Sequence, residues 1–294
     1  MLYRKFKLLN SKGEEYTLTE KNFKVFANNP QGLGFSKSLS TIRLGDEEIL
    51  LYSMINLETI NFELLFYDDK LSDKYQKYLE FMRFISFKPI LLYYQRPNSF
   101  DWYRRSIEIV SLGKTEVDYN DSMLHCPFTM KTLGFWEDDI ENELVIVKQE
   151  EDGGKIYPIT YPINYGANSL RNVKLISQGL LDTPMEIFVD GATENAEWVL
   201  YDSDDNIYGR AKFNGEFDTI YVNSRESEEE IKLFKNGIYL DNPLSYQDLT
   251  IGSPNQINIT FLKLKVGQSK ISFLFDLAFQ GSVRIKWRNR YVSV

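Results

Sequence analysis

The sequence predicts a mainly β protein with two domains, and three observations carry this prediction. Short apolar runs recur along most of the chain, separated by turn residues roughly every ten positions. Large aromatic residues, which favour sheets, are abundant, with 20 Phe and 19 Tyr. Helical spacing of apolar residues is clear only within residues 73–85. A chain of 294 residues can build two ordinary domains, each with a substantial core.

The first domain is expected to span residues 1–140 and to open with a β-hairpin. Apolar residues before position 10 precede a polar turn, and residues 16–18 form the returning strand. The segment Asn29-Pro30-Gln31-Gly32-Leu33-Gly34-Phe35 follows. Its glycines could cradle a phosphate at the start of a helix, but residues 35–43 are rich in Ser and β-branched side chains and predict no helix. We therefore interpret the segment as a tight corner that leaves the hairpin.

One amphipathic helix is predicted at residues 73–85. Ser72 or Asp73 can cap its start, and Pro89 lies just past its end. An isolated helix between strands should pack across a sheet. The apolar face expected to reach the core consists of Tyr75, Tyr78, Leu79, Met82 and Ile85. The strands expected around the helix are residues 48–54, 60–67, 89–94, 104–111 and 125–133.

The second domain is expected to span residues 141–294, after the acidic stretch at 137–143, and to be almost entirely β. Apolar residues are odd-numbered in 256–261 but even-numbered in 262–266, which predicts a bulge or strand break between the two. Many short strands with frequent turns predict a β-sandwich or jelly roll. The strands expected here are residues 185–190, 197–201, 217–222, 238–240, 256–261, 262–266 and 283–288.

Charge and composition argue against several partners. The net charge of −8 gives no electrostatic support for binding nucleic acid, so no such partner is expected. No apolar stretch approaches the roughly twenty residues of a spanning helix, so no membrane insertion is expected. The single cysteine, Cys126, excludes an intramolecular disulfide and fits a reducing cytoplasm. No secretion signal is recognisable, so release from the cell is expected by lysis.

No catalytic, cofactor-binding or metal-binding residue is predicted, and the protein is not expected to be an enzyme. The single histidine, His125, adjoins Cys126 on a strand, where neighbouring side chains point to opposite faces and cannot form a thiol–imidazole dyad. The count of Cys and His also excludes the common zinc sites. A pair of carboxylates for glycoside hydrolysis stays open, because its spacing is spatial.

The acidic segment at residues 202–206 has the opening pattern of a calcium loop. It lacks the glycine of such a loop, and Phe213 stands where the final carboxylate should be. Asp and Asn dominate exposed turns, so we interpret the segment as an acidic hairpin turn.

A basic ladder near the end of the chain has two interpretations. On an edge strand, such charges would block pairing with other chains. Alternatively, they would form a docking face for an acidic neighbouring subunit. The ladder consists of Arg284, Lys286, Arg288 and Arg290, which alternate with apolar residues.

Several of these features together resemble the distal tail proteins of siphophages that infect Gram-positive bacteria. The amino-terminal hairpin, the corner after it, the helix and the segment Phe128-Thr-Met-Lys-Thr-Leu-Gly-Phe-Trp136 are similar to the ring-forming first domain of that family. Residues from Asn168 onward, with 182–187 and 249–259, are similar to its second domain. The resemblance therefore covers nearly the whole chain.

The resemblance implies a structural role at the distal end of a phage tail. Members of the family form a homohexameric ring that joins the tail tube protein to the tail-associated hub protein, and many carry receptor-binding proteins for host attachment. Their second domain is a galectin-like jelly roll, which in some members bears an extension that grips receptor-binding trimers. Residues 200–245, acidic and loop-rich, are the expected place for such an extension. The implied location is the virion, after assembly in the host bacterial cytoplasm, and the sequence identifies no partner-binding residue.

Two other function classes stay open. One is a carbohydrate-binding adhesin with a lectin-like second domain, although the His-x-Asn-x-Arg pattern of galectins is absent. The other is a glycan-degrading enzyme of the tail tip, which would need the carboxylate pair. Abundant aromatic residues and edge-rich β-domains favour a ring of repeated subunit interfaces.

Overall fold

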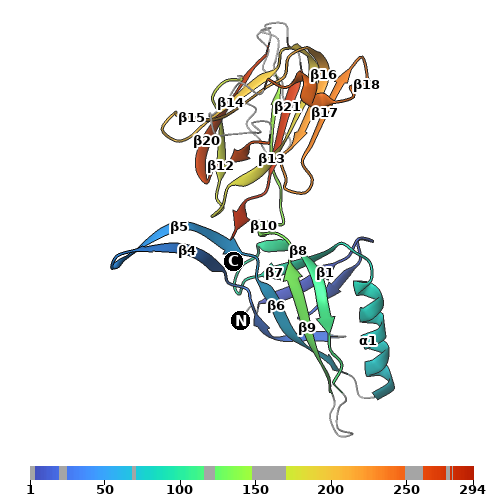
Figure 1. The fold of residues 1–294 in the computed structure, drawn as a ribbon. Helices are drawn as coiled ribbons and strands as arrows, with labels where there is room; N and C mark the ends of the chain where they lie inside the picture. The colour runs from blue at the N-terminus through green and yellow to red at the C-terminus, as the bar shows by residue number, and fades with distance from the viewer. Residues whose placement is uncertain are drawn as a thin grey trace. The chain divides into compact units, whose positions relative to one another are not determined.

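The computed structural model describes residues 4–19, 25–67, 71–115, 123–147, 170–248, 261–275, 279 and 281–294. These residues form a mainly β fold with one α-helix, so the predicted fold class is confirmed. The chain divides into two compact units (Figure 1): unit 1 comprises Met1–Asp139 with Arg290–Val294, and unit 2 comprises Ile140–Asn289. Residues 290–294, which the sequence analysis assigned to the second domain, lie in unit 1 because they pair with a strand of that unit.

The core of unit 1 lies inside a nine-stranded antiparallel sheet that curves back on itself. The strand order is β2-β1-β7-β8-β9-β6-β3, with β10 beside β8 and β22 beside β10. A hydrogen bond of 2.8 Å from the Ala27 N–H in β3 to the Leu18 carbonyl, just past β2, links the two ends of this order. Phe6 of β1 and Phe62 of β6 meet edge to face, with ring centroids 4.9 Å apart, although their strands are not neighbours. The strands are β1 (Lys5–Leu9), β2 (Glu15–Thr17), β3 (Val25–Gln31), β6 (Thr59–Tyr67), β7 (Ile90–Gln95), β8 (Trp102–Leu112), β9 (Met123–Thr132), β10 (Trp136–Asp138) and β22 (Arg290–Tyr291).

Helix α1 (Leu71–Ile85) packs on this core with a face that differs in part from the predicted one. Phe81 and Phe84 are buried, and the Phe81 ring lies 5.6 Å from that of Phe128 in β9. Leu79 and Met82, which we expected in the core, are 50% and 39% exposed. The helix is turned so that the larger aromatic rings are buried, because each ring removes more apolar area from water. The helix also begins at Leu71, so Ser72 and Asp73 lie within its first turn rather than at the cap.

A separate two-stranded antiparallel sheet, formed by β4 (Ser36–Leu44) and β5 (Glu47–Asn56), belongs to unit 1. Figure 1 shows this hairpin extending away from the nine-stranded sheet. Its two-residue turn places Gly45 at φ +68, a conformation that glycine adopts without steric cost. We call residues 36–56 the arm.

Unit 2 is a β-sandwich, as predicted, and its two sheets enclose one hydrophobic core. The larger sheet has the order β11-β21-β13-β16-β17-β18, with β19 beside β13, and the smaller has the order β12-β20-β14-β15. Trp198 of β14 lies at the centre of the core, with its ring 5.5 Å from Phe213 and 6.1 Å from Phe273. The elements are β11 (Asn142–Val147), β12 (Val173–Ser177), β13 (Thr183–Glu194), β14 (Glu197–Tyr201), β15 (Ile207–Lys212), β16 (Glu216–Asn223), β17 (Glu230–Lys235), β18 (Ile238–Tyr239), the 3-10 helix η1 (Pro243–Tyr246), β19 (Lys263–Leu264), β20 (Gly267–Leu274) and β21 (Ser282–Trp287).

Most of residues 200–245, expected to hold an extension, is built into the sandwich as β15 to β18, with Phe217 and Leu233 fully or almost fully buried. The strand predicted at 256–261 lies outside the described residues except for Phe261, as do Asn168 and the motif at 249–259. The even-numbered phase expected after it holds for Leu262 and Leu264, which are buried, but not for Val266, which is 47% exposed.

Candidate functional site

The histidine and the cysteine lie on opposite faces of β9, as predicted. The Cys126 side chain is buried in the core, and burial raises the pKa of its thiol to about 11. The His125 side chain is 37% exposed, and its Nδ1 lies 2.8 Å from Oε1 of Glu63 in β6. The hydrogen bond with His125 lowers the pKa of the Glu63 carboxyl. The structure therefore pairs the imidazole with a carboxylate of the neighbouring strand, and not with the thiol.

The acidic segment at 202–206 forms the hairpin turn between β14 and β15. Oδ1 of Asp202 accepts hydrogen bonds from the backbone N–H groups of Asp204 at 3.0 Å and Asn206 at 2.9 Å. The Asn206 N–H also lowers the pKa of the Asp202 carboxyl. The carboxylate therefore holds its own turn together. Among the described residues, no cluster of three or more His, Cys, Asp or Glu side chains is placed to hold a metal ion.

The edge-strand interpretation of the basic ladder is wrong for Arg284 and Lys286, which lie on β21, whereas Arg290 lies on β22, which stands at the end of its sheet beside β10. Strand β21 lies between β11 and β13, because its backbone pairs on both sides. Its cations face carboxylates of the same unit: Arg284 lies 3.3 Å from Glu143, and Lys286 lies 3.6 Å from Glu141. Arg225, which follows β16, adds a contact of 2.9 Å to Glu141. Docking of an acidic neighbour on this ladder stays a prediction, and these ion pairs already occupy the charges that it would use.

The arm carries a run of exposed hydrophobic residues. Eight of its large apolar side chains are between 44% and 63% exposed, and Ile55 at its base is half-buried. Scattered exposed hydrophobic residues are normal on a soluble protein, but a contiguous group of this kind marks a site of interaction. The group consists of Leu39, Ile42, Leu44, Ile49, Leu50, Leu51, Tyr52 and Met54.

The arm is apolar on both of its faces. Directly paired residues of an antiparallel ribbon share a face, which places Ile42 with Ile49 on one side and Thr41 with Leu50 on the other. Tyr52 and Met54 continue the first face, opposite Ser40 and Ser38 respectively. A register shift between Ser40 and Thr41 marks a bulge at the middle of the ribbon. Neither face is covered by the described part of the chain, so both are available to a partner.

Sequence reasoning missed this site, although one signal pointed to it. The sequence predicts a strand at residues 48–54 in the first domain but does not predict that it is exposed. The run Ile49-Leu50-Leu51-Tyr52 does not alternate, and an unbroken apolar run is typical of a strand that is buried on both faces. The described residues of unit 1 bury neither face of β5, so the apolar run stays exposed instead of being enclosed.

The comparisons with known proteins agree with the fold. Residues 5–133 match the family model of the distal tail protein, N-terminal domain. A chain of the phage P2 baseplate in its activated conformation with Ca is 17% identical over 100% of both chains, with a TM-score of 0.57. The SPP1 Dit (gp 19.1) protein, described as a paradigm of the hub adsorption apparatus in Gram-positive infecting phages, is 10% identical over 96% of this chain and 98% of that chain, with a TM-score of 0.62.

These matches confirm the resemblance to distal tail proteins that the sequence indicated. The two solved structures share the fold over both units. At such identities the two structures establish the fold alone. No curated protein matches the chain by sequence. The described residues contain no helix that is long and apolar enough to cross a membrane.

Proposed function

We propose, from the distal tail protein domain that residues 5–133 form, that this chain is a structural component of the phage tail tip which assembles with copies of itself through the arm. The assembly is a homohexameric ring at the distal end of the tail. It joins the tail tube protein to the tail-associated hub protein and scaffolds receptor-binding proteins for host attachment.

The exposed arm is the observation that carries the proposal. A hairpin of two strands without a third strand or a packed face is at best marginally stable in water. The arm nevertheless has nine-residue and ten-residue strands with apolar side chains on both faces. Docking on a second copy removes this surface from water. A head-to-tail contact of this kind, repeated around an axis, closes into a ring.

Images of the purified protein by negative-stain electron microscopy test the proposal. The wild-type chain should form rings of six subunits at micromolar concentration. The Leu51→Asp variant places a charge in the docked surface and should leave single chains. Ile238→Asp is the matched control, because Ile238 is exposed by 68% on a strand of unit 2, and its rings should persist.

Single chains of wild-type protein at every concentration would contradict self-assembly. Rings formed by Leu51→Asp as readily as by the wild type would keep self-assembly and reject the arm as its interface.

A further inference from the structure

The arm joins unit 1 through two short stretches, residues 32–35 before β4 and residues 57–58 after β5. A ribbon without a third strand has no neighbour along its length to orient it. Its direction is therefore set where these stretches leave the nine-stranded sheet. The two stretches are held by different parts of unit 1.

The stretch after β5 is held by β9. The Lys131 ammonium donates a hydrogen bond of 2.7 Å to the Leu57 carbonyl. The Thr132 hydroxyl donates one of 2.6 Å to the Glu58 carbonyl. This side of the arm is thus fixed by the sheet itself.

The stretch before β4 is held by the closing segment, which we define as residues 290–294. The Ser293 hydroxyl donates a hydrogen bond of 3.2 Å to the Leu33 carbonyl. Leu33 and Val294 both pack against the hydrophobic core of unit 1. Gly32 stands directly before this contact at φ +79, pressed so closely on Thr59 that an added Cβ would lie 2.0 Å from the Thr59 carbonyl oxygen.

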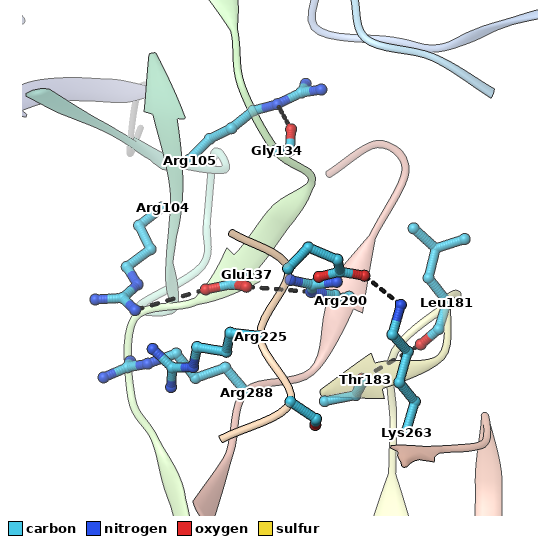
Figure 2. Close-up of polar contacts among 12 residues, drawn as sticks. Arg104, Arg105, Gly134, Glu137, Leu181, Thr183, Arg225, Lys263, Arg288 and Arg290 are labelled. Carbon is cyan, nitrogen blue, oxygen red and sulfur yellow. Dashed lines mark hydrogen bonds and ion pairs between the residues drawn. The ribbon is translucent and has the colours of Figure 1, made fainter. Parts of the chain in front are cut away.

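The closing segment is itself firmly attached to unit 1 (Figure 2). Nε of Arg290 lies 3.2 Å from one carboxylate oxygen of Glu137, and Nη2 of Arg104 lies 3.5 Å from the other. The ring of Tyr291 meets that of Tyr103 edge to face at 5.3 Å. Burial and the neighbouring Asp138 raise the pKa of the Tyr291 hydroxyl. These contacts fix the position of the closing segment, and with it the position of the Ser293 hydroxyl that bonds to Leu33.

We propose that the closing segment is a positioning element for the arm: Val294 anchors the segment on the core of unit 1, and the Ser293 hydroxyl holds the Leu33 carbonyl of the stretch before β4 and so aims the arm for docking on a second copy. The inference rests on the proposed self-assembly for its purpose, but its structural part stands on contacts within unit 1. The closing segment follows all of unit 2 in the sequence. The contact that aims the arm can therefore form only after unit 2 has been synthesised.

Amide hydrogen exchange of single chains, followed by mass spectrometry of peptides, tests the inference. The variant Ser293→Ala/Val294→Asp should speed exchange at residues 33–37 about tenfold, as expected for the loss of one hydrogen bond and its packing, and leave β6 unchanged. Ser293→Thr keeps the hydroxyl and should restore wild-type exchange. The matched control is Ser86→Ala, which removes a hydroxyl bond of 2.7 Å to the Arg83 carbonyl elsewhere in unit 1.

Unchanged exchange at residues 33–37 in the double variant would overturn the inference. Faster exchange throughout unit 1 would also overturn it, because the closing segment would then stabilise the fold without aiming the arm. If the wild-type chain forms no rings, the proposed function fails, while the exchange measurement still decides whether the closing segment holds the arm.

Discussion

The arm and the β16–β17 pair are both long antiparallel pairs rich in apolar residues, yet only β16–β17 is covered by its own chain. Buried and less buried residues alternate along β17, where Ile231 and Leu233 point into the core. In β5 no residue is buried, and eight of its ten positions are exposed. The difference lies in the second layer. The smaller sheet of unit 2 covers β16 and β17, whereas no described layer covers the arm.

The two regions show that strand formation and the burial of apolar side chains are separate properties of a sequence. β-branched and aromatic residues make a segment extend and pair, which both regions do. Whether the apolar side chains then leave water depends on a facing surface, which the chain need not supply. An apolar ribbon that is exposed in a folded protein therefore indicates that a partner has an apolar surface to cover it.

The largest expected effect comes from placing the same charge in both regions. Leu233→Asp buries an unpaired carboxylate in unit 2 and should cost several kcal/mol, enough to unfold that unit. Leu51→Asp in the arm should change the free energy of unfolding of the single chain by no more than about 0.5 kcal/mol. Denaturant unfolding followed by circular dichroism measures both. A large loss of stability for Leu51→Asp would mean that the arm is packed within its own chain.

Substitution of two glycines compares the attachment of the arm, at Gly32, with its tip, at Gly45. Gly32→Ala has to move the Thr59 backbone as well as adopt φ +79, and should cost about 2–4 kcal/mol. Gly45→Ala at the tip has a similar positive φ but no atom within 4 Å of the added methyl group, and should cost about 1 kcal/mol. Thermal unfolding of the two variants ranks them. Equal losses of stability would show that the close contact of Gly32 with Thr59 does not limit substitution at the attachment.

The smallest effect concerns the pair of Glu63 and His125 on the solvent side of β6 and β9. The pKa of Glu63 is lowered in the folded chain, so its stabilising contribution is present above its ordinary value of 4.5 and is lost as pH falls through the lowered value. Both side chains are more than a third exposed, so solvent screening limits the contribution to about 0.5 kcal/mol. Glu63→Gln should be slightly less stable than the wild type at pH 7 and equal to it near pH 3.

Unfolding curves across this pH range measure that difference. His125→Gln should remove the same pH-dependent part, because it removes the strongest cause of the shift. A difference between Glu63→Gln and the wild type that grows toward low pH would contradict the assignment.

The sequence was sufficient for the parts of the fold that depend on local period. Alternation identified strand β6, and the 3.6-residue period identified the helix, because both patterns arise within a few neighbouring residues. Prediction from the sequence failed where contacts between distant segments determine which residues are buried or which strands pair. The inner face of α1 was set by Phe81 and Phe84 packing on far strands, and β21 became an inner strand only because β11 pairs with it. The exposure of the arm is of the same kind, since it depends on whether a second layer covers the ribbon, and the described residues provide none.

A photo-crosslinking amino acid at Tyr52 tests the central claim most directly. Benzoylphenylalanine keeps the ring of tyrosine and adds a benzoyl group, which an exposed site can hold, and Tyr52 is 58% exposed on the arm. Irradiation should join two chains, with the adduct mapped by mass spectrometry to unit 1 of the second copy. The same amino acid at Tyr239, 45% exposed in unit 2, is the control and should give no such product. Absence of a chain-to-chain adduct from position 52, or equal yields from both positions, would contradict self-assembly through the arm.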